Sequence, residues 1–246
     1  MEPQVRQRLH ALNAAFYRTF GLAYAQTRGR VQPGVARLLA QIPPTARVLD
    51  AGCGHGLVAR HLAARGFRGT YVGLEASPVL LAQARQQAPR GVQARFAAGD
   101  LTASAWPAAA AGPFDVLLAF AVLHHVPGRA ARRAVLQRLR QRAAGPTAWL
   151  AVSVWQFWRS PRLRARVQPW SQTGLQPAQV EPGDFLLDWR HGGRGLRYVH
   201  LYTPAELAAD LAAAGWDVRT MFLADGEGGR LGLYAVARPL APSDCA

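Results

Sequence analysis

Acidic residues and glycines recur at the ends of apolar segments in the first hundred residues. A glycine turn directly after a buried strand lets the backbone approach a nucleoside-containing cofactor closely. A carboxylate at the end of the next strand can accept hydrogen bonds from both ribose hydroxyls. This spacing predicts a cofactor site at one edge of a sheet. The residues concerned are Asp50, Gly52, Gly54, Gly56, Glu75, Asp100 and Leu101.

The glycine turn differs from the G-x-G-x-x-G turn of dinucleotide sites, because its third glycine, Gly56, comes one residue early. It is similar to motif I of the class I S-adenosylmethionine (SAM) methyltransferases. The resemblance implies that SAM is the cofactor, with its methionine and ribose lying against Gly52 and Gly54. Asp50 would then hold the methionine amine through water.

The two later acids complete this resemblance. It implies that Glu75 holds the ribose, that Asp100 binds the adenine amine, and that Leu101 covers the adenine ring. Each acid taken singly fits a helix N-cap or a solvated turn equally well. Three acids at successive strand ends, together with the glycine turn, favour SAM binding.

A pair of histidines, His124-His125, ends the fourth apolar segment, at the sheet edge where ligands bind in α/β folds. Their surroundings, with four further segments, resemble the tRNA wobble-uridine carboxymethyl methyltransferases. Those enzymes esterify 5-carboxymethyluridine at the first anticodon position. The matching segments are 24–28, 121–125, 150–155, 183–189 and 197–207.

The resemblance implies a carboxylate nucleophile, which is already ionised at neutral pH and needs no general base. Positioning and exclusion of water would then supply most of the catalysis. Each candidate residue could instead have a structural role. The candidate catalytic residues are His124, His125, Arg28, Arg197 and Tyr202, and the candidate substrate-binding residues are Trp155, Tyr198 and His200.

Two other functions remain open at this point. A small-molecule O- or C-methyltransferase would share the same cofactor segments, and so would a SAM-binding protein without catalytic activity. The chain also departs from the wobble-uridine family, with His55 in place of Asn, Glu75-Ala76 in place of Asp-Arg, and Asp188 in place of Pro. The last change bears on the acceptor, whose arm could be carboxymethyl or oxyacetyl.

Strands and helices alternate along the chain, which predicts an α/β fold with a parallel sheet. We expect a Rossmann-like, seven-stranded, mostly parallel sheet with helices on both faces and a C-terminal antiparallel hairpin. Residues 1–246 would form a single SAM methyltransferase domain, with a helical cap over about 1–45 and a substrate-side insertion over about 156–197. The expected strands are 47–51, 71–74, 93–97, 114–123, 148–155, 218–223 and 231–237.

The chain is strongly basic, with a formal net charge of +15 from 29 basic residues, all arginine, and 14 acidic ones. Codon bias in a GC-rich genome accounts for the choice of arginine, but not for the excess of positive charge. A polyanion such as tRNA is therefore an expected partner. The eukaryotic relatives also use a small activator protein, which makes such a protein a second candidate partner.

The number of cysteines and the hydropathy of the sequence indicate whether the protein binds a metal and where in the cell it is found. The two cysteines, Cys53 and Cys245, are too few for a zinc site, so no metal is expected. The sequence has no apolar run of about 18 residues, and its first residues are polar. We expect a cytoplasmic protein that does not insert in a membrane.

Overall fold

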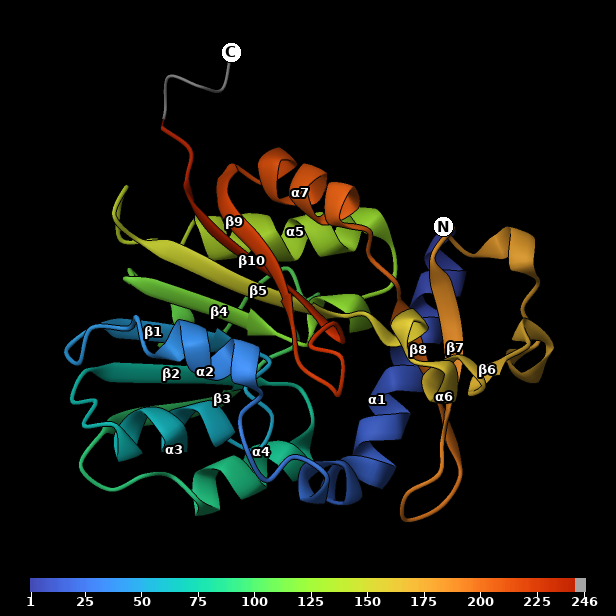
Figure 1. The fold of residues 1–246 in the computed structure, drawn as a ribbon, viewed down its shortest axis with the longest axis horizontal. Coiled ribbons are helices and arrows are strands. Elements are labelled where there is room, and N and C mark those ends of the chain that lie inside the picture. Colours follow the sequence, from blue (N-terminus) through green and yellow to red (C-terminus); the bar gives the residue numbers. More distant parts are fainter. Residues whose placement is uncertain (242–246) are drawn as a thin grey trace.

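A seven-stranded sheet forms the centre of the computed structural model, which describes residues 1–241 (Figure 1). The strand order is β3-β2-β1-β4-β5-β10-β9. The first five strands are parallel, and β10 runs antiparallel to both of its neighbours. The predicted fold class is confirmed. The strands are β1 (Arg47–Ala51), β2 (Thr70–Glu75), β3 (Gln93–Ala98), β4 (Val116–Phe120), β5 (Trp149–Trp155), β9 (Trp216–Ala224) and β10 (Gly232–Pro239).

Helices cover both faces of this sheet, as expected from the doubly wound pattern. On one face α5 (Arg129–Arg140) and α7 (Pro204–Ala213) bury Leu136 and Leu211 against the strands. On the other face α2 (Pro33–Leu39) and α3 (Leu57–Ala64) bury Leu38 and Leu62. The helix α4 (Pro78–Gln86) packs against β3. The apolar stripes of these helices therefore fix the sheet between two cores.

The predicted insertion is more regular than expected. Residues 156–197 were expected as a substrate-side insertion with no strand assigned to it, but the chain forms a second, antiparallel sheet in the order β6-β7-β8. Its strands are short, and Gly192 and Gly193 turn the chain between the last two, which hid them from the sequence pattern. The elements are α6 (Pro161–Arg164), β6 (Val167–Gln168), β7 (Asp184–Trp189) and β8 (Gly195–His200).

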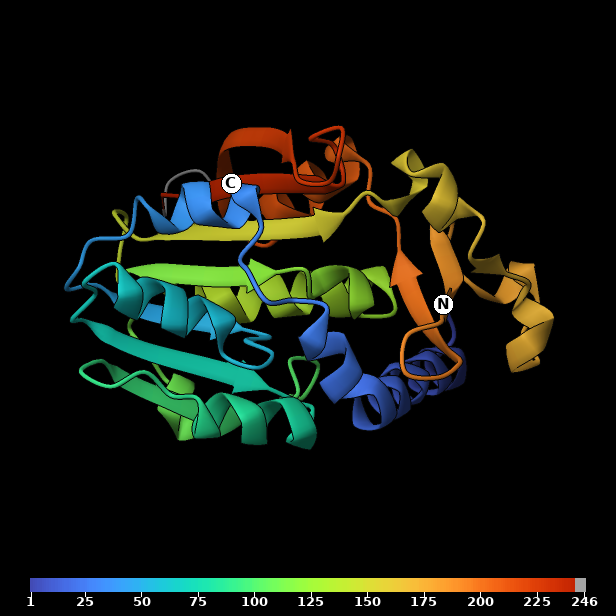
Figure 2. The same ribbon diagram turned by 60° about the horizontal axis from the view of Figure 1, so that its bottom comes forward.

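The first helix, α1 (Pro3–Gln26), lies between the two sheets. It packs against α4 of the main sheet and against β8 of the second sheet. Figure 2 shows β4 and β5 pointing their carboxyl ends toward α1 and the second sheet. Any ligand at the carboxyl edge of the parallel strands therefore meets α1 on its other side.

The fourth strand is shorter than predicted. The apolar run 114–123 was expected as one strand, but β4 covers only Val116–Phe120. At Ala121 the backbone enters the left-handed region, with φ of 51°, and its N–H donates to the carbonyl oxygen of Ser153 at 3.0 Å. The chain then forms a 3-10 helix at Leu123–His125. This turn places the histidine pair beyond the strand end.

Two observations bear on location and on the cysteines. No helix within residues 1–241 is both long enough and apolar enough to cross a bilayer. Cys53 is buried as a free thiol in the glycine turn, and Cys245 lies outside the described residues.

Candidate active site

The glycine turn follows β1 with a backbone that favours glycine. Gly52 and Gly54 have φ of 85° and 56°. A Cβ on Gly52 would come within 2.7 Å of the Val122 side chain, whereas a Cβ on Gly54 would meet no atom within 4 Å. The turn is held by the N–H groups of Gly52 and Cys53, which both donate to the Leu74 carbonyl. It is thus packed on one side and open on the other.

The Glu75 carboxylate is fixed by the same turn. One oxygen accepts the Gly54 N–H at 2.9 Å and the other accepts the Ser77 N–H at 2.8 Å. Each carboxylate oxygen can accept a further hydrogen bond, so two adjacent acceptors remain for a vicinal diol. Burial raises the pKa of Glu75, and the backbone donors oppose that shift. The residue thus has the chemistry predicted for a ribose-binding acid.

Asp100 is oriented from both sides. Thr102 donates its N–H and its hydroxyl to one carboxylate oxygen, both at 2.8 Å. Nε2 of His10, on α1, lies 3.3 Å from the other oxygen. The hydrogen bond with His10 lowers the pKa of Asp100 to about 2. Asp100 therefore presents an ionised carboxylate beside α1.

A cavity of about 360 Å³ joins these groups. Its size lies in the range of small-molecule sites, and it is closed on one side by α1. Five of the seven predicted cofactor residues line it, namely Gly52, Gly54, Glu75, Asp100 and Leu101. The acids and the open turn in one cavity wall suit a nucleoside with a flexible chain.

The other two predicted cofactor residues do not line this cavity. Asp50 is 2% exposed and accepts a hydrogen bond from the Tyr71 hydroxyl. Burial raises the pKa of Asp50 to about 7. Gly56 is the N-cap of α3, in the left-handed region. Asp50 and Gly56 thus support the glycine turn on the side away from the cavity.

A second cavity of about 390 Å³ lies next to the first. Five predicted residues line it: Arg28, His124, His125, Trp155 and Arg197. The two cavities share Tyr24, Phe120, Ala121 and His125 in their walls. A group bound in one cavity can therefore reach a group bound in the other at this junction, and we call the second one the acceptor cavity.

Comparison with known proteins identifies the domain. A family model described as a methyltransferase domain matches residues 24–221. The chain belongs to the methyltransferase domain family. It therefore carries a SAM-dependent methyltransferase domain, and the predicted cofactor is confirmed. The finer resemblance to the wobble-uridine enzymes stays a prediction.

The matched relatives include enzymes named for small molecules. The chain is 33% identical over 174 residues to 2-methyl-6-phytyl-1,4-hydroquinone methyltransferase of Synechocystis sp., across 61% of this chain and 52% of that protein. It is 39% identical over 100 residues to trans-aconitate 2-methyltransferase of Streptomyces avermitilis, across 38% of this chain and 36% of that protein. The chain thus spans about half, or less, of the curated relatives it matches.

Solved structures agree with the fold. Magnesium protoporphyrin IX methyltransferase from Synechocystis, solved with bound SAH, has a TM-score of 0.63 at 19% identity, covering 92% of this chain and 97% of that one. A SAM-dependent methyltransferase from Methanosarcina mazei has a TM-score of 0.65 at 20% identity, covering 86% and 99%. At these identities the likeness shows the fold alone.

In this methyltransferase domain, Arg197 is the buried cation of the acceptor cavity. It is 5% exposed and makes no ion pair within residues 1–241. Its guanidinium carbon lies 4.9 to 5.5 Å from the ring centres of Phe16, Trp155 and Trp189. Its Nε has no hydrogen-bond partner, and burial lowers its pKa. A buried cation that packs against aromatic faces and keeps an unsatisfied Nε–H can bind an anion.

The two histidines are held in their neutral form. Burial and, to a smaller extent, the charge of Arg197 together lower the pKa of His125 to about 3. Burial, then the neighbouring His125, takes the pKa of His124 well below its ordinary value. Histidines of this kind are weak bases at neutral pH.

Three of the predicted residues line neither cavity: Tyr198, His200 and Tyr202. Asp184 accepts hydrogen bonds from the Tyr198 hydroxyl and from His200, each at 2.7 Å. The other His200 nitrogen lies 2.9 Å from Glu206 on α7. Tyr198 and His200 are thus internal supports of β8 rather than groups that contact a ligand in either cavity.

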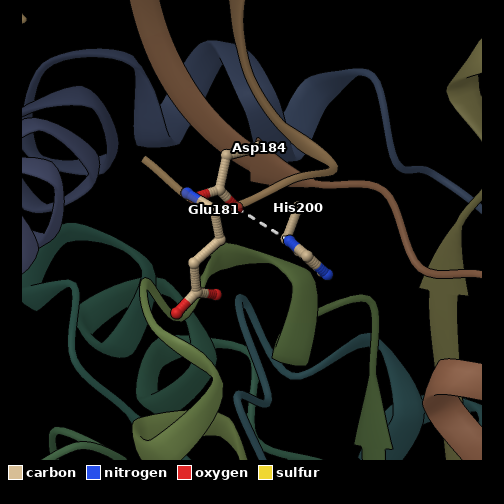
Figure 3. A group of neighbouring side chains, drawn as sticks. All are labelled: Glu181, Asp184 and His200. Atoms are coloured by element: carbon tan, nitrogen blue, oxygen red, sulfur yellow. Dashed lines mark hydrogen bonds and ion pairs between the residues drawn. The ribbon is translucent and has the colours of Figure 1, made fainter. Parts of the chain in front are cut away.

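Glu181 lies beside this pair, and with Asp184 and His200 it forms a cluster of side chains of metal-ligating types (Figure 3). Their polar atoms already form hydrogen bonds with other protein groups. Glu181 accepts the Arg129 N–H and the Arg132 guanidinium, at 3.0 to 3.1 Å, while the Asp184–His200 hydrogen bond is drawn in Figure 3. These hydrogen bonds join the end of β8 to β7, and the segment before β7 to α5, so we interpret the cluster as structural.

The sequence predicted a helical cap over the cofactor site, but it did not identify which α1 side chains line the cavities. His10, Asn13, Tyr17 and Tyr24 all line the cofactor cavity, and Tyr24 lines the acceptor cavity as well. The available signal was the run of aromatic residues at helical spacing in α1, which is also typical of a helix that packs on a core. Trp189, on β7, was likewise quoted only as part of a matching segment.

Proposed function

We propose that this protein transfers a methyl group from SAM to a carboxylate of a small-molecule acceptor, forming a methyl ester. The observation that carries the proposal is the buried, unpaired guanidinium of Arg197 in the wall of the acceptor cavity. A bidentate carboxylate would supply the hydrogen-bond partners that this guanidinium lacks. Arg28, whose guanidinium stacks on Tyr24 in the same wall, adds a second positive charge.

Among residues 1–241, the groups shared by the two cavities include no strong base, which supports a nucleophile that is already ionised. The His125 ring is neutral near neutral pH, and its low pKa makes it a poor acceptor of a second proton. When bound, SAM supplies a methyl carbon whose bond to sulfur breaks, with the electron pair left on sulfur, as the carboxylate oxygen bonds to it. No proton is released. The residues of the acceptor cavity then need only align the oxygen and exclude water.

The cofactor cavity suits this role. We assign the ribose hydroxyls to Glu75, the adenine amine to Asp100 and the methionine portion to the turn at Gly52 and Gly54. Asp50 lies outside the cavity wall, so it would position the glycine turn rather than contact the cofactor. The helix α1 covers the bound cofactor and reaches the acceptor cavity through Tyr24.

The relatives favour a small molecule over tRNA, since they are named for a hydroquinone and for trans-aconitate. One observation keeps the carboxymethyl group of a wobble uridine as a second candidate. Arg162 and Arg166 line the acceptor cavity, and the neighbouring Arg159 and Arg164 are exposed. Such a cluster suits phosphate contacts.

A transfer assay with methyl-labelled SAM separates the two candidates. The purified protein is incubated with a set of aromatic and aliphatic carboxylic acids, and in parallel with tRNA from a strain that lacks the gene. Formation of a base-labile ester on an acid supports the proposal. Label in tRNA that falls steeply with salt supports the second candidate instead. Base-stable label on any acceptor would contradict ester formation.

A further inference from the structure

The two adjacent histidines of the acceptor cavity carry their protons on opposite nitrogens. The backbone N–H of Trp155 donates to Nδ1 of His124 at 3.2 Å. Because an N–H can only donate, Nδ1 of His124 has no proton. The ring is neutral, so its proton is on Nε2. His124 therefore offers a hydrogen-bond donor at Nε2.

His125 has the reverse arrangement. Its Nδ1 lies 3.1 Å from the carbonyl oxygen of Tyr198. A carbonyl can only accept, so Nδ1 of His125 carries the proton, and Nε2 of this neutral ring has a free lone pair. His125 therefore offers a hydrogen-bond acceptor at Nε2.

Asn13, on α1, holds the backbone that sets this arrangement. Its side-chain amide donates to the carbonyl oxygens of His125 and Tyr198, at 3.0 and 3.1 Å, and accepts the Tyr198 N–H at 2.8 Å. Asn13 is 6% exposed, and these three bonds tie α1, the histidine turn and β8 together. The Tyr198 carbonyl is thus held against His125.

Neither Nε2 atom forms a hydrogen bond with any residue of 1–241, and neither is fully enclosed by protein. The two rings, 4.3 Å apart between centres, line the acceptor cavity together with Arg197. A carboxylate suits the His124 donor and the guanidinium. It does not suit the His125 lone pair, because two acceptors facing each other repel.

From this geometry we infer that the acceptor is a hydroxycarboxylic acid, an inference that rests on the proposed function. Its carboxylate accepts hydrogen bonds from Arg197 and from Nε2–H of His124, and a neighbouring hydroxyl donates to Nε2 of His125. An ammonium group could also donate there, but the positive charges of Arg28 and Arg197 disfavour it. The carboxylate oxygen remains the nucleophile, and the hydroxyl positions it.

The test compares mandelate with phenylacetate, which lacks only the hydroxyl, by calorimetric titration in the presence of SAH. We expect mandelate to bind roughly tenfold more tightly, the usual scale for satisfying one buried acceptor. The preference should fall to about one in His125→Leu and be retained in His125→Gln, whose amide oxygen can accept. His61→Leu, on α3 away from both cavities, is the matched control.

Three results would overturn the inference: equal binding of the two acids, a preference that persists in His125→Leu, or nitrogen NMR showing the His125 proton on Nε2. Ester analysis of parallel mixtures that contain SAM in place of SAH separates this inference from the proposed function. Equal esterification of both acids would refute the hydroxyl preference alone. Selective binding without ester would refute the proposed transfer alone, and no binding of either acid would refute both.

Discussion

Replacing Arg197 with methionine should make the protein more stable and less able to bind its acceptor. The guanidinium is 5% exposed, and removing such a charge from water costs several kcal/mol. The three aromatic contacts contribute roughly 1 kcal/mol each, and the unpaired Nε costs about 1–3 kcal/mol. Methionine fills most of the same space without a charge. We expect the free energy of unfolding to rise by roughly 1–2 kcal/mol.

Two measurements check this prediction. A rise of that size corresponds to a melting temperature higher by roughly 2–8 °C for a domain of this length. Titration with a carboxylate acceptor in the presence of SAH should show a loss of about 10- to 150-fold in affinity, the value of one charge-assisted hydrogen-bonding group. The affinity for SAH alone should stay nearly constant, because Arg197 does not line the cofactor cavity.

The matched control is Arg194→Met, an exposed arginine in the turn before β8. Its stability should stay within about 0.5 kcal/mol of the parent protein. If Arg197→Met is instead destabilised by more than 1 kcal/mol, or binds the acceptor normally, the guanidinium is structural and the reasoning fails.

Three further predictions concern the cofactor side. Glu75→Gln should weaken SAH binding by about 10- to 150-fold, since it removes one of two charged acceptors; unchanged affinity in a calorimetric titration would assign the ribose elsewhere. Burial raises the pKa of Asp50 to about 7, so its contribution favours folding below about pH 4 and is lost as pH rises to 7. Between pH 4 and pH 7, the free energy of unfolding of Asp50→Asn should therefore rise relative to that of the parent protein, by on the order of 4 kcal/mol in urea unfolding. If the difference between the two proteins does not change with pH, the raised pKa is contradicted. Asn13→Ala should lower the free energy of unfolding by about 2–3 kcal/mol, because it leaves buried backbone groups of Tyr198 unpaired; amide exchange at Tyr198 reports whether those bonds are lost.

The cofactor side of the site was largely predictable from sequence. The turn at Gly52 and Gly54 requires a left-handed backbone, and the chain shows this need locally as glycine spacing after an apolar strand. Glu75 and Asp100 end their strands, and parallel strands bring their ends to one edge. Local pattern and topology together were therefore sufficient to bring five of the seven predicted cofactor residues into one cavity wall.

The acceptor side was predictable only in part, because contacts between distant segments decide it. Successive side chains of β8 point to opposite faces of the strand. Arg197 therefore lines the acceptor cavity, while Tyr198 and His200 form hydrogen bonds with Asp184. Spacing alone cannot tell which of two alternating faces meets a cavity, since both faces of β8 are buried.

What the sequence determined by itself is the fold class, the glycine turn and the acids at the strand ends, since these depend on hydrophobic period and backbone conformation within short segments. Only the tertiary structure decided which α1 side chains line the cofactor cavity and that Arg197 lies among aromatic rings without an ion-pair partner. It also decided the tautomers of His124 and His125, because their partners, the Trp155 N–H and the Tyr198 carbonyl, are 31 and 73 residues away along the chain. Hydrogen bonds between such distant groups exist only after the two sheets and α1 have packed together.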